Sequence, residues 1–241
     1  MIFRRYSFYV NMKDVHSHYL PCVDDGSPDL SVSLKMLAEA AKQGVTEIVL
    51  TPHYRGKYRL KKEELTPLFT EFCEAVKGAG IDVKLHLGQE VHYEKGVFAD
   101  IKNAKFATLC GGKYILTELP FGEEVEAYDL ALRIISQGYV PVFAHVERYN
   151  YLDEGYLGDL RELGAMIQVN AETISGRGKK EFGKKVMRFF KAGLVDVVAS
   201  DAHFNRENRM AKAYKTIKGK FGADVAERAF ETNPKKIIDN V

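Results

Sequence analysis

Five of the seven histidines in this 241-residue chain stand where short apolar runs end. His16 and His18 follow the first run, His53 follows the second, and His145 and His203 follow later ones. Imidazole nitrogens are common ligands of divalent metal ions. His16 and His18 are two residues apart in an extended segment, so they point to the same side and could bind one ion together. A single histidine would be an ordinary core or surface residue, but this recurrence favours a metal site.

Carboxylates accompany these histidines. Glu90, Glu118 and Asp201 also follow apolar runs, and an acidic loop at residues 23–26 lies close to the first histidine pair. Carboxylate oxygens complete the kind of mixed ligand set that divalent ions accept. For Asp24 two readings stay open: a metal-binding carboxylate, or part of a turn that leads into the next helix.

Regular elements must bring these separated residues together. Short apolar runs alternate with amphipathic segments along the chain, which indicates β-α-β-α order. Strands are expected at residues 13–15, 46–50, 83–87, 114–117, 140–143, 166–169 and 195–199. Helices are expected at residues 30–43, 63–77, 125–137, 182–192, 210–218 and 225–230.

This order predicts an α/β fold, and seven strands in a chain of this length favour a (β/α)7 TIM-like barrel. An open doubly wound sheet would give the same pattern, because periodicity does not report closure. In both architectures, active sites form at the carboxyl ends of the strands, where the histidines and carboxylates stand. One domain over residues 12–241 is expected. Residues 1–11 are read as an N-terminal extension, with translation starting at Met12 as the alternative.

Composition excludes several function classes. The formal net charge is +2 and no basic stripe is present, so nucleic acid is not an expected partner. No apolar run approaches the roughly 20 residues that span a bilayer. The three cysteines form no C-x-x-C pair and none has arginine six residues later, which argues against thiolate zinc and against a cysteine-nucleophile phosphatase. A reducing, cytoplasmic location is expected.

A family resemblance becomes specific at this point. The motifs D-x-H-x-H from Asp14, D-D-G, T-P-H, G-Q-E, A-H-x-E-R-Y and S-D-A-H occur in this order. They resemble the polymerase-and-histidinol-phosphatase (PHP) family, and more narrowly its bacterial tyrosine-protein phosphatase branch, the regulators of capsular polysaccharide synthesis. Many other PHP members have histidine where this chain has Asp25 and Glu118, and these carboxylates favour the tyrosine-phosphatase branch. The resemblance covers about residues 12–241.

The resemblance implies a distorted seven-stranded barrel that holds three divalent metal ions. Manganese is the expected metal, while iron, zinc and magnesium also suit the ligand types. The resemblance also implies two arginines that contact phosphate. Arg148 and Arg206 stand three residues after His145 and His203, and Arg209 competes with Arg206 for its role. The implied ligand sets are His16, His18, Glu90 and Asp201 for one ion, Glu90, Glu118 and His145 for a second, and Asp25, His53 and His203 for the third.

The expected reaction is hydrolysis of a phosphate monoester by attack of a metal-bound hydroxide. The resemblance supplies the substrate, phosphotyrosine on a bacterial tyrosine kinase that controls capsule or exopolysaccharide synthesis. An alternative keeps the site and changes the substrate to histidinol phosphate or another small monoester. A nuclease or proofreading module is a further alternative, and it would call for a basic stripe or an attached polymerase domain.

Four weaker features remain. Residues 54–59, basic and aromatic, should overhang the site as a substrate-gripping or simply solvated loop. His86 and His92 flank Glu90 at even spacing and could be ligands, neighbours of ligands or pocket residues. Asn170, at the end of the sixth strand, has no assigned role. Residues 175–180 superficially resemble a phosphate-binding loop and are read as a flexible loop entering a helix.

Overall fold

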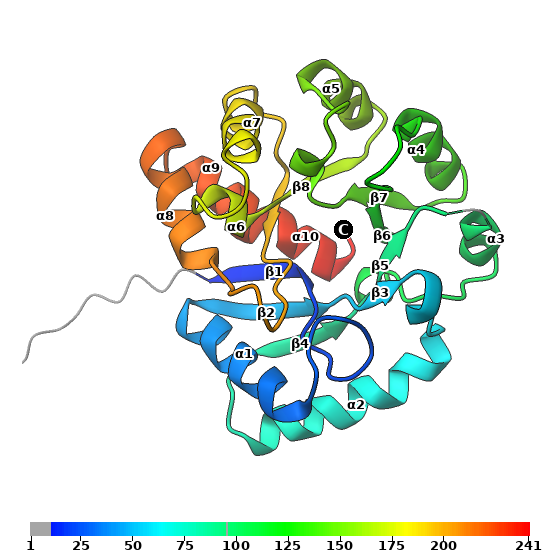
Figure 1. Cartoon of the computed structure of the whole chain (residues 1–241), viewed down its shortest axis with the longest axis vertical. Coiled ribbons are helices and arrows are strands. Elements are labelled where there is room, and N and C mark those ends of the chain that lie inside the picture. The colour runs from blue at the N-terminus through cyan, green and yellow to red at the C-terminus, as the bar shows by residue number, and fades with distance from the viewer. Residues whose placement is uncertain (1–10, 95) are drawn as a thin grey trace, which may run out of the picture.

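The computed structural model describes residues 11–94 and 96–241 of the chain. The proposed extension at residues 1–11 lies outside this described part, apart from Asn11. Within the described residues, the first strand begins at Met12, where the sequence pattern also begins. Helices surround a curled set of strands, as Figure 1 shows. The predicted α/β fold is therefore confirmed.

Nine strand segments are present in the described residues, and every pairing between them is parallel. One sheet has the order β1-β2-β4 and the other has the order β3-β5-β6-β7-β8-β9. The strands are β1 Met12–Ser17, β2 Val45–Leu50, β3 His53–Tyr54, β4 Lys84–Leu87, β5 Glu90–His92, β6 Tyr114–Glu118, β7 Val140–Phe143, β8 Met166–Asn170 and β9 Val197–Ala199.

The strand count of seven expected from the sequence differs from these nine segments. Two-residue interruptions explain the difference, because Thr51 and Pro52 separate β2 from β3, and Gly88 and Gln89 separate β4 from β5. The proline lacks the backbone donor that a ladder needs. At Gly88 an added Cβ would lie 2.8 Å from the side chain of Leu109, so the close approach there requires glycine.

The first and last strands meet along their carboxyl ends. Ser17 and Ala202 form a parallel bridge, the His18 amide donates to the Ala202 carbonyl at 3.1 Å, and the Asp201 amide donates to the His16 carbonyl at 2.9 Å. The strands therefore curl round far enough to bring the two ends of the strand series together. This contact places the residues that follow β1 beside those that follow β9.

The six helices expected from the amphipathic pattern are present, with four additions. The sequence pattern did not reveal α3, α5, α6 or α10, because α3, α6 and α10 are short helices and α5 buries only Leu157 and Leu160. The helices are α1 Leu30–Lys42, α2 Lys62–Gly78, α3 Val97–Lys102, α4 Ala127–Ile135, α5 Glu154–Glu162, α6 Ala171–Ile174, α7 Lys180–Lys191, α8 Met210–Phe221, α9 Ala223–Glu227 and α10 Asn233–Asp239, with a π-helical turn at Arg228–Thr232. No helix in the described ranges is long and apolar enough to cross a membrane.

Alternate strand residues pack into two separate apolar clusters, which we call the inner and the outer cluster. In β6, Leu116 belongs to the inner cluster and Ile115 to the outer one, and in β7 the same holds for Val142 and Phe143. Successive side chains of a strand point to opposite faces, so both faces of the parallel sheet are buried. Outer-cluster residues pack under the helices, while inner-cluster residues fill the space within the curl.

The C-terminal helix α10 closes the inner cluster. Ile237 and Ile238 pack with Val15, Leu116 and Val197, which come from three different strands. In Figure 1 this helix, drawn red, crosses the middle of the ring of strands. The end of the chain is tied down as well, since Asn240 Oδ1 accepts a hydrogen bond from the Lys113 amide at 2.7 Å.

Replacing Ile237 with alanine tests the inner cluster. Ile237 is fully buried, so the substitution should lower the free energy of unfolding by about 2–5 kcal/mol through lost burial and a residual cavity. Urea denaturation followed by circular dichroism measures the change. As a matched control, Leu132→Ala removes a similar side chain that is 43% exposed on α4 and should cost less than about 1 kcal/mol. Equal losses in both variants would contradict this account of the core.

Candidate metal centre

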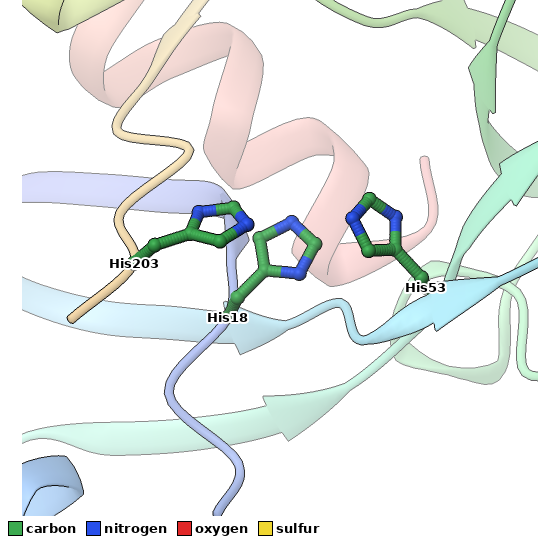
Figure 2. Close-up of side chains that lie close together, drawn as sticks. All are labelled: His18, His53 and His203. Carbon is green, nitrogen blue, oxygen red and sulfur yellow. The ribbon is translucent and has the colours of Figure 1, made fainter. Parts of the chain in front are cut away.

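The predicted ligand residues converge at the carboxyl ends of the strands. Figure 2 shows the imidazoles of His18, His53 and His203 pointing toward one another. These three residues come from the segment after β1, from β3 and from the segment after β9. Their ligand nitrogens lie within 4.8 Å of one another. Separated stretches of the chain therefore meet in one place.

Glu90 lies at the centre of the cluster. Its Oε1 is 3.0 Å from His145 Nε2 and 3.3 Å from His16 Nε2, and its Oε2 is 2.8 Å from His53 Nδ1 and 3.4 Å from His18 Nε2. Four imidazoles thus surround a single buried carboxylate. Each of its oxygens faces a different pair of nitrogens, which is the arrangement a carboxylate needs to bridge two ions.

The remaining expected ligands occupy the two flanks of Glu90. On one flank, Glu118 Oε1 lies 3.7 Å from His145 Nε2. On the other, Asp25 Oδ1 lies 3.3 Å from His53 Nε2 and 3.7 Å from His203 Nε2. Each implied ligand set from the sequence is therefore a set of neighbours in space.

Asp201 divides its two oxygens between two functions. Oδ1 lies 3.6 Å from both His16 Nε2 and His18 Nε2. Oδ2 accepts hydrogen bonds from Arg148 at 2.7 Å, Arg206 at 2.8 Å and the Asn170 side chain at 2.8 Å. The sequence left Asn170 without a role, and the structure shows that it fixes this carboxylate so that Oδ1 faces the histidines.

The spacing of the donor atoms fits divalent metal ions. Two ligand atoms that each lie about 2.1 Å from one ion, at roughly 90–110° to each other, are about 3.0–3.4 Å apart. The distances around Glu90 fall in or close to this interval. His53 Nδ1 and Glu90 Oε2 are buried and make no hydrogen bond to any described residue, although they lie 2.8 Å apart. Buried polar atoms without hydrogen bonds are rare in proteins, and ligation by a cation would satisfy both.

Neighbouring acceptors fix which nitrogen of two histidines is free to bind a metal. Asp24 Oδ2 lies 2.7 Å from His18 Nδ1, and Gln168 Oε1 lies 3.0 Å from His16 Nδ1. Carboxylate and amide oxygens only accept, so each Nδ1 carries the proton and each Nε2 is left as the ligand atom. The two Nε2 atoms lie 3.2 Å apart. Asp24 therefore orients His18, and Gln168, which the sequence analysis missed, orients His16.

The electrostatics of the cluster favour added positive charge. Burial acts against ionisation, but the charge of Asp24 raises the pKa of His18 to about 9, and Glu90 and Asp25 raise the pKa of His53 to about 10. Burial alone would raise the pKa of Asp201, but the positive charges of Arg148 and His16 hold that pKa well below its usual value. Without metal, His18 and His53 therefore favour the protonated form, and bound cations would supply the same positive charge.

Two of the converging residues have left-handed backbones. His145 has φ 36° and Asp201 has φ 48°. Residues other than glycine rarely adopt this region, at a cost of order 1–3 kcal/mol each. Each lies two residues after the end of a strand, β7 for His145 and β9 for Asp201, and the turn directs the side chain into the cluster. The fold therefore accepts local strain at positions that could bind metal.

Basic side chains lie beside the cluster. Arg148 and Arg206 contact Asp201, whereas Arg209 pairs with Glu207 away from the cavity. Arg55, from the segment expected to overhang the site, lies 3.2 Å from Glu118 Oε2. The cavity measures about 90 Å³ and is lined by Asp25, His53, Arg55, Glu90, Glu118, Phe121, His145, Arg148, Asp201, His203 and Arg206.

The structure places His92 beside the cluster, and it places His86 and residues 176–180 outside it. His92 Nδ1 contacts Glu118 Oε2 at 2.9 Å, so this residue is a neighbour of the cluster. His86 instead contacts Glu47 at 3.1 Å and belongs to none of the donor groups in the described residues. Residues 176–180 line a separate cavity of about 450 Å³ with parts of α7 and α8, and that cavity contains no residue of the cluster.

The fold and the site together define a TIM-barrel-like α/β protein with a candidate multinuclear metal centre. The CpsB/CapC family, described as capsular polysaccharide synthesis, matches residues 12–239. The chain belongs to this family.

Relatives along the whole chain are tyrosine-protein phosphatases. CpsB of Streptococcus pneumoniae is 34% identical over 239 residues, which cover 94% of this chain and 98% of that protein. YwqE of Bacillus subtilis is 31% identical, covering 89% of this chain and 87% of that protein. A chain from the crystal structures of YwqE and CpsB, described as unique metal-dependent tyrosine phosphatases, superposes with a TM-score of 0.87 at 28% identity and 95% coverage of both chains.

More distant structures share the fold alone. The phosphotriesterase homology protein of Escherichia coli, solved with phosphate in its active site, is 11% identical with a TM-score of 0.61, covering 94% of this chain and 98% of that one. An amidohydrolase of Mycoplasma synoviae is 14% identical with a TM-score of 0.59, covering 95% and 88%. These likenesses support the TIM-barrel-like architecture.

Replacing Glu90 with glutamine should disrupt metal binding. The amide keeps the shape but removes the charge at the centre of four imidazoles, so we expect affinity for divalent ions to fall by about 100-fold or more. Elemental analysis after dialysis against limiting metal measures the loss. Glu162→Gln, an exposed position on α5, should bind as the unaltered protein does. A Glu90→Gln protein with full metal content would refute the central place given to this carboxylate.

Proposed function

We propose that this protein is a metal-dependent protein-tyrosine phosphatase. The observation that carries the proposal is the buried cluster of imidazoles and carboxylates with two arginines directly beside it. Membership of the CpsB/CapC family and tyrosine-phosphatase relatives over nearly the whole chain support the same activity.

Three divalent ions are the proposed complement, with manganese as the proposed metal. His16, His18, Glu90 and Asp201 would hold one ion, and Glu90, Glu118 and His145 a second. Asp25, His53 and His203 would hold the third. Bound ions would supply Lewis acidity toward the phosphoryl oxygens and lower the pKa of bound water. The nitrogen and oxygen donors without thiolate also suit iron, zinc or magnesium.

Arg148 and Arg206 are the proposed phosphate-binding residues. Each guanidinium carries five N–H donors, and each uses one of them on Asp201 Oδ2. Further donors remain to bind phosphoryl oxygens while that contact holds the side chain in place. Arg206 is preferred over Arg209 because it lines the cavity and Arg209 does not.

The reaction requires positioning and charge neutralisation. A water oxygen forms a bond to phosphorus, the bond from phosphorus to the phenolic oxygen breaks, and a proton from that water ends on the tyrosine. The phenol leaves readily, since its pKa is about 10. The arginines bind the charge that develops on the equatorial oxygens, and the buried setting strengthens these contacts. The general acid is left unassigned.

The proposed substrate is phosphotyrosine on a bacterial tyrosine kinase that regulates capsule or exopolysaccharide synthesis. The proposed location is the cytoplasm, which suits the unpaired state of Cys22, Cys73 and Cys110. We further propose one domain over residues 12–241. It would form a distorted seven-stranded barrel, with β2–β3 and β4–β5 as two interrupted strands.

Parallel assays test the activity. Protein loaded with Mn²⁺ should release phosphate from a phosphotyrosine peptide much faster than from histidinol phosphate, and chelation followed by dialysis should abolish this turnover. Restoring Mn²⁺ should restore it. Preference for histidinol phosphate would defeat the tyrosine-phosphatase proposal in favour of a small-molecule phosphatase. Full activity after complete metal removal would defeat metal dependence.

Alanine at His145 should lower kcat by about 1,000-fold or more, which corresponds to roughly 4 kcal/mol of transition-state stabilisation. The reason is loss of a nitrogen that lies 3.0 Å from Glu90. His86→Ala is the matched control, because His86 contacts Glu47 outside the cluster, and it should keep kcat within about twofold. Steady-state kinetics on the phosphotyrosine peptide gives both values. Near-normal turnover by the His145 variant would refute its assignment.

A further inference from the structure

The cavity at the metal centre has one apolar wall. Among the described residues that line it, Phe121 is the only one with a purely hydrocarbon side chain, and all others are acidic, basic or imidazole groups. Phe121 is 54% exposed. The exposed part of this side chain therefore borders a polar cavity, where a ligand with an apolar part would cover it.

Local contacts hold the Phe121 ring in a fixed orientation. Its ring stacks on Tyr149, with centroids 5.4 Å apart and planes at 12°, and on His145, with centroids 5.7 Å apart and planes at 28°. Tyr149 is buried, and its hydroxyl donates to the Leu119 carbonyl at 2.9 Å and accepts from the Leu119 amide at 3.0 Å. These contacts hold the segment that carries Phe121 in place, and 54% of the Phe121 side chain remains exposed.

The lining of the cavity distinguishes two parts of a substrate. Apart from Phe121, the lining consists of charged and imidazole side chains, which suit a phosphoryl group and not an aromatic ring. The ring of a phosphotyrosine bound there would therefore lie at the mouth, where Phe121 provides the apolar surface.

We infer that Phe121 forms an aryl-binding subsite that packs against the ring of the leaving group and selects aryl over alkyl phosphomonoesters. This inference rests on the proposed phosphatase function and adds the feature that recognises the phenol. Aromatic pairs prefer stacked or edge-to-face contact, and such contact contributes beyond the area that it buries. Phe121 is a specificity-determining residue here, since it touches the substrate ring and not the phosphorus.

Binding of phosphonates to the Mn²⁺-loaded protein tests the subsite without turnover. Isothermal titration calorimetry should show phenylphosphonate binding about tenfold more tightly than methylphosphonate, which corresponds to about 1.4 kcal/mol. Phe121→Ala should lose this tenfold preference by weakening phenylphosphonate alone, with methylphosphonate affinity unchanged within about twofold. Phe121→Tyr should retain the preference because it keeps the ring.

Phe204→Ala is the matched control. Phe204 is 57% exposed and follows His203, yet it does not line the cavity. It should bind both phosphonates as the unaltered protein does. Equal weakening of both ligands in Phe121→Ala would mean that Phe121 acts only by supporting His145, and it would overturn the inference. No change for either ligand, or loss of the preference in Phe121→Tyr, would overturn it as well.

Kinetics separate this inference from the proposed function. A contact made equally in the ground and transition states alters KM and leaves kcat unchanged. Phe121→Ala should therefore raise KM about tenfold for phosphotyrosine and leave the KM for glycerol phosphate unchanged. Phosphotyrosine hydrolysis by the unaltered protein with unchanged KM in the variant would refute the subsite alone. No phosphotyrosine hydrolysis by the unaltered protein would refute the proposed function itself.

Discussion

The site depends on one constraint: carboxylate oxygens and imidazole nitrogens lie close together in a buried space, with their lone pairs facing one another. Glu90 meets four imidazole nitrogens at 2.8–3.4 Å, and the Nε2 atoms of His16 and His18 lie 3.2 Å apart with their protons held on the opposite side of each ring. Such an assembly is stable only when positive charge sits between the donors. The rest of the molecule supplies the conditions for this: the strand ends converge, the surrounding core excludes water, and the left-handed turns at His145 and Asp201 direct their side chains inward.

At the edge of the site, several residues together compensate the negative charge of Asp201. Asp201 gives one oxygen to the histidines and the other to Arg148, Arg206 and Asn170. These arginines neutralise a buried carboxylate and at the same time line the cavity that an anionic substrate would enter. One carboxylate thus connects the candidate metal-binding region with the proposed anion-binding region, and a change at Asp201 would affect both.

The sequence identified those site residues whose side chains suit metal binding and which also stand at the end of an apolar run. Glu118 and His145 were recognisable because parallel strands bring their carboxyl ends to one place, which requires no knowledge of side-chain packing. Gln168 and Phe121 were not recognisable, because their roles depend on which neighbour a buried amide faces and which ring lies at the mouth. The division into nine segments was not recognisable for a related reason, since backbone interruptions such as the one at Pro52 leave the apolar pattern intact.

Closure of the inner cluster by α10 bears on how the chain acquires its structure. Ile237 and Ile238 pack against Val15, near the other end of the described chain. Contacts between such distant positions form slowly, because a large loop must be ordered before they contribute any stability. During ribosomal synthesis, the apolar inner faces of the strands are therefore complete long before the helix that covers them emerges. Until α10 packs, these apolar faces lack their cover, and exposed apolar surface favours aggregation.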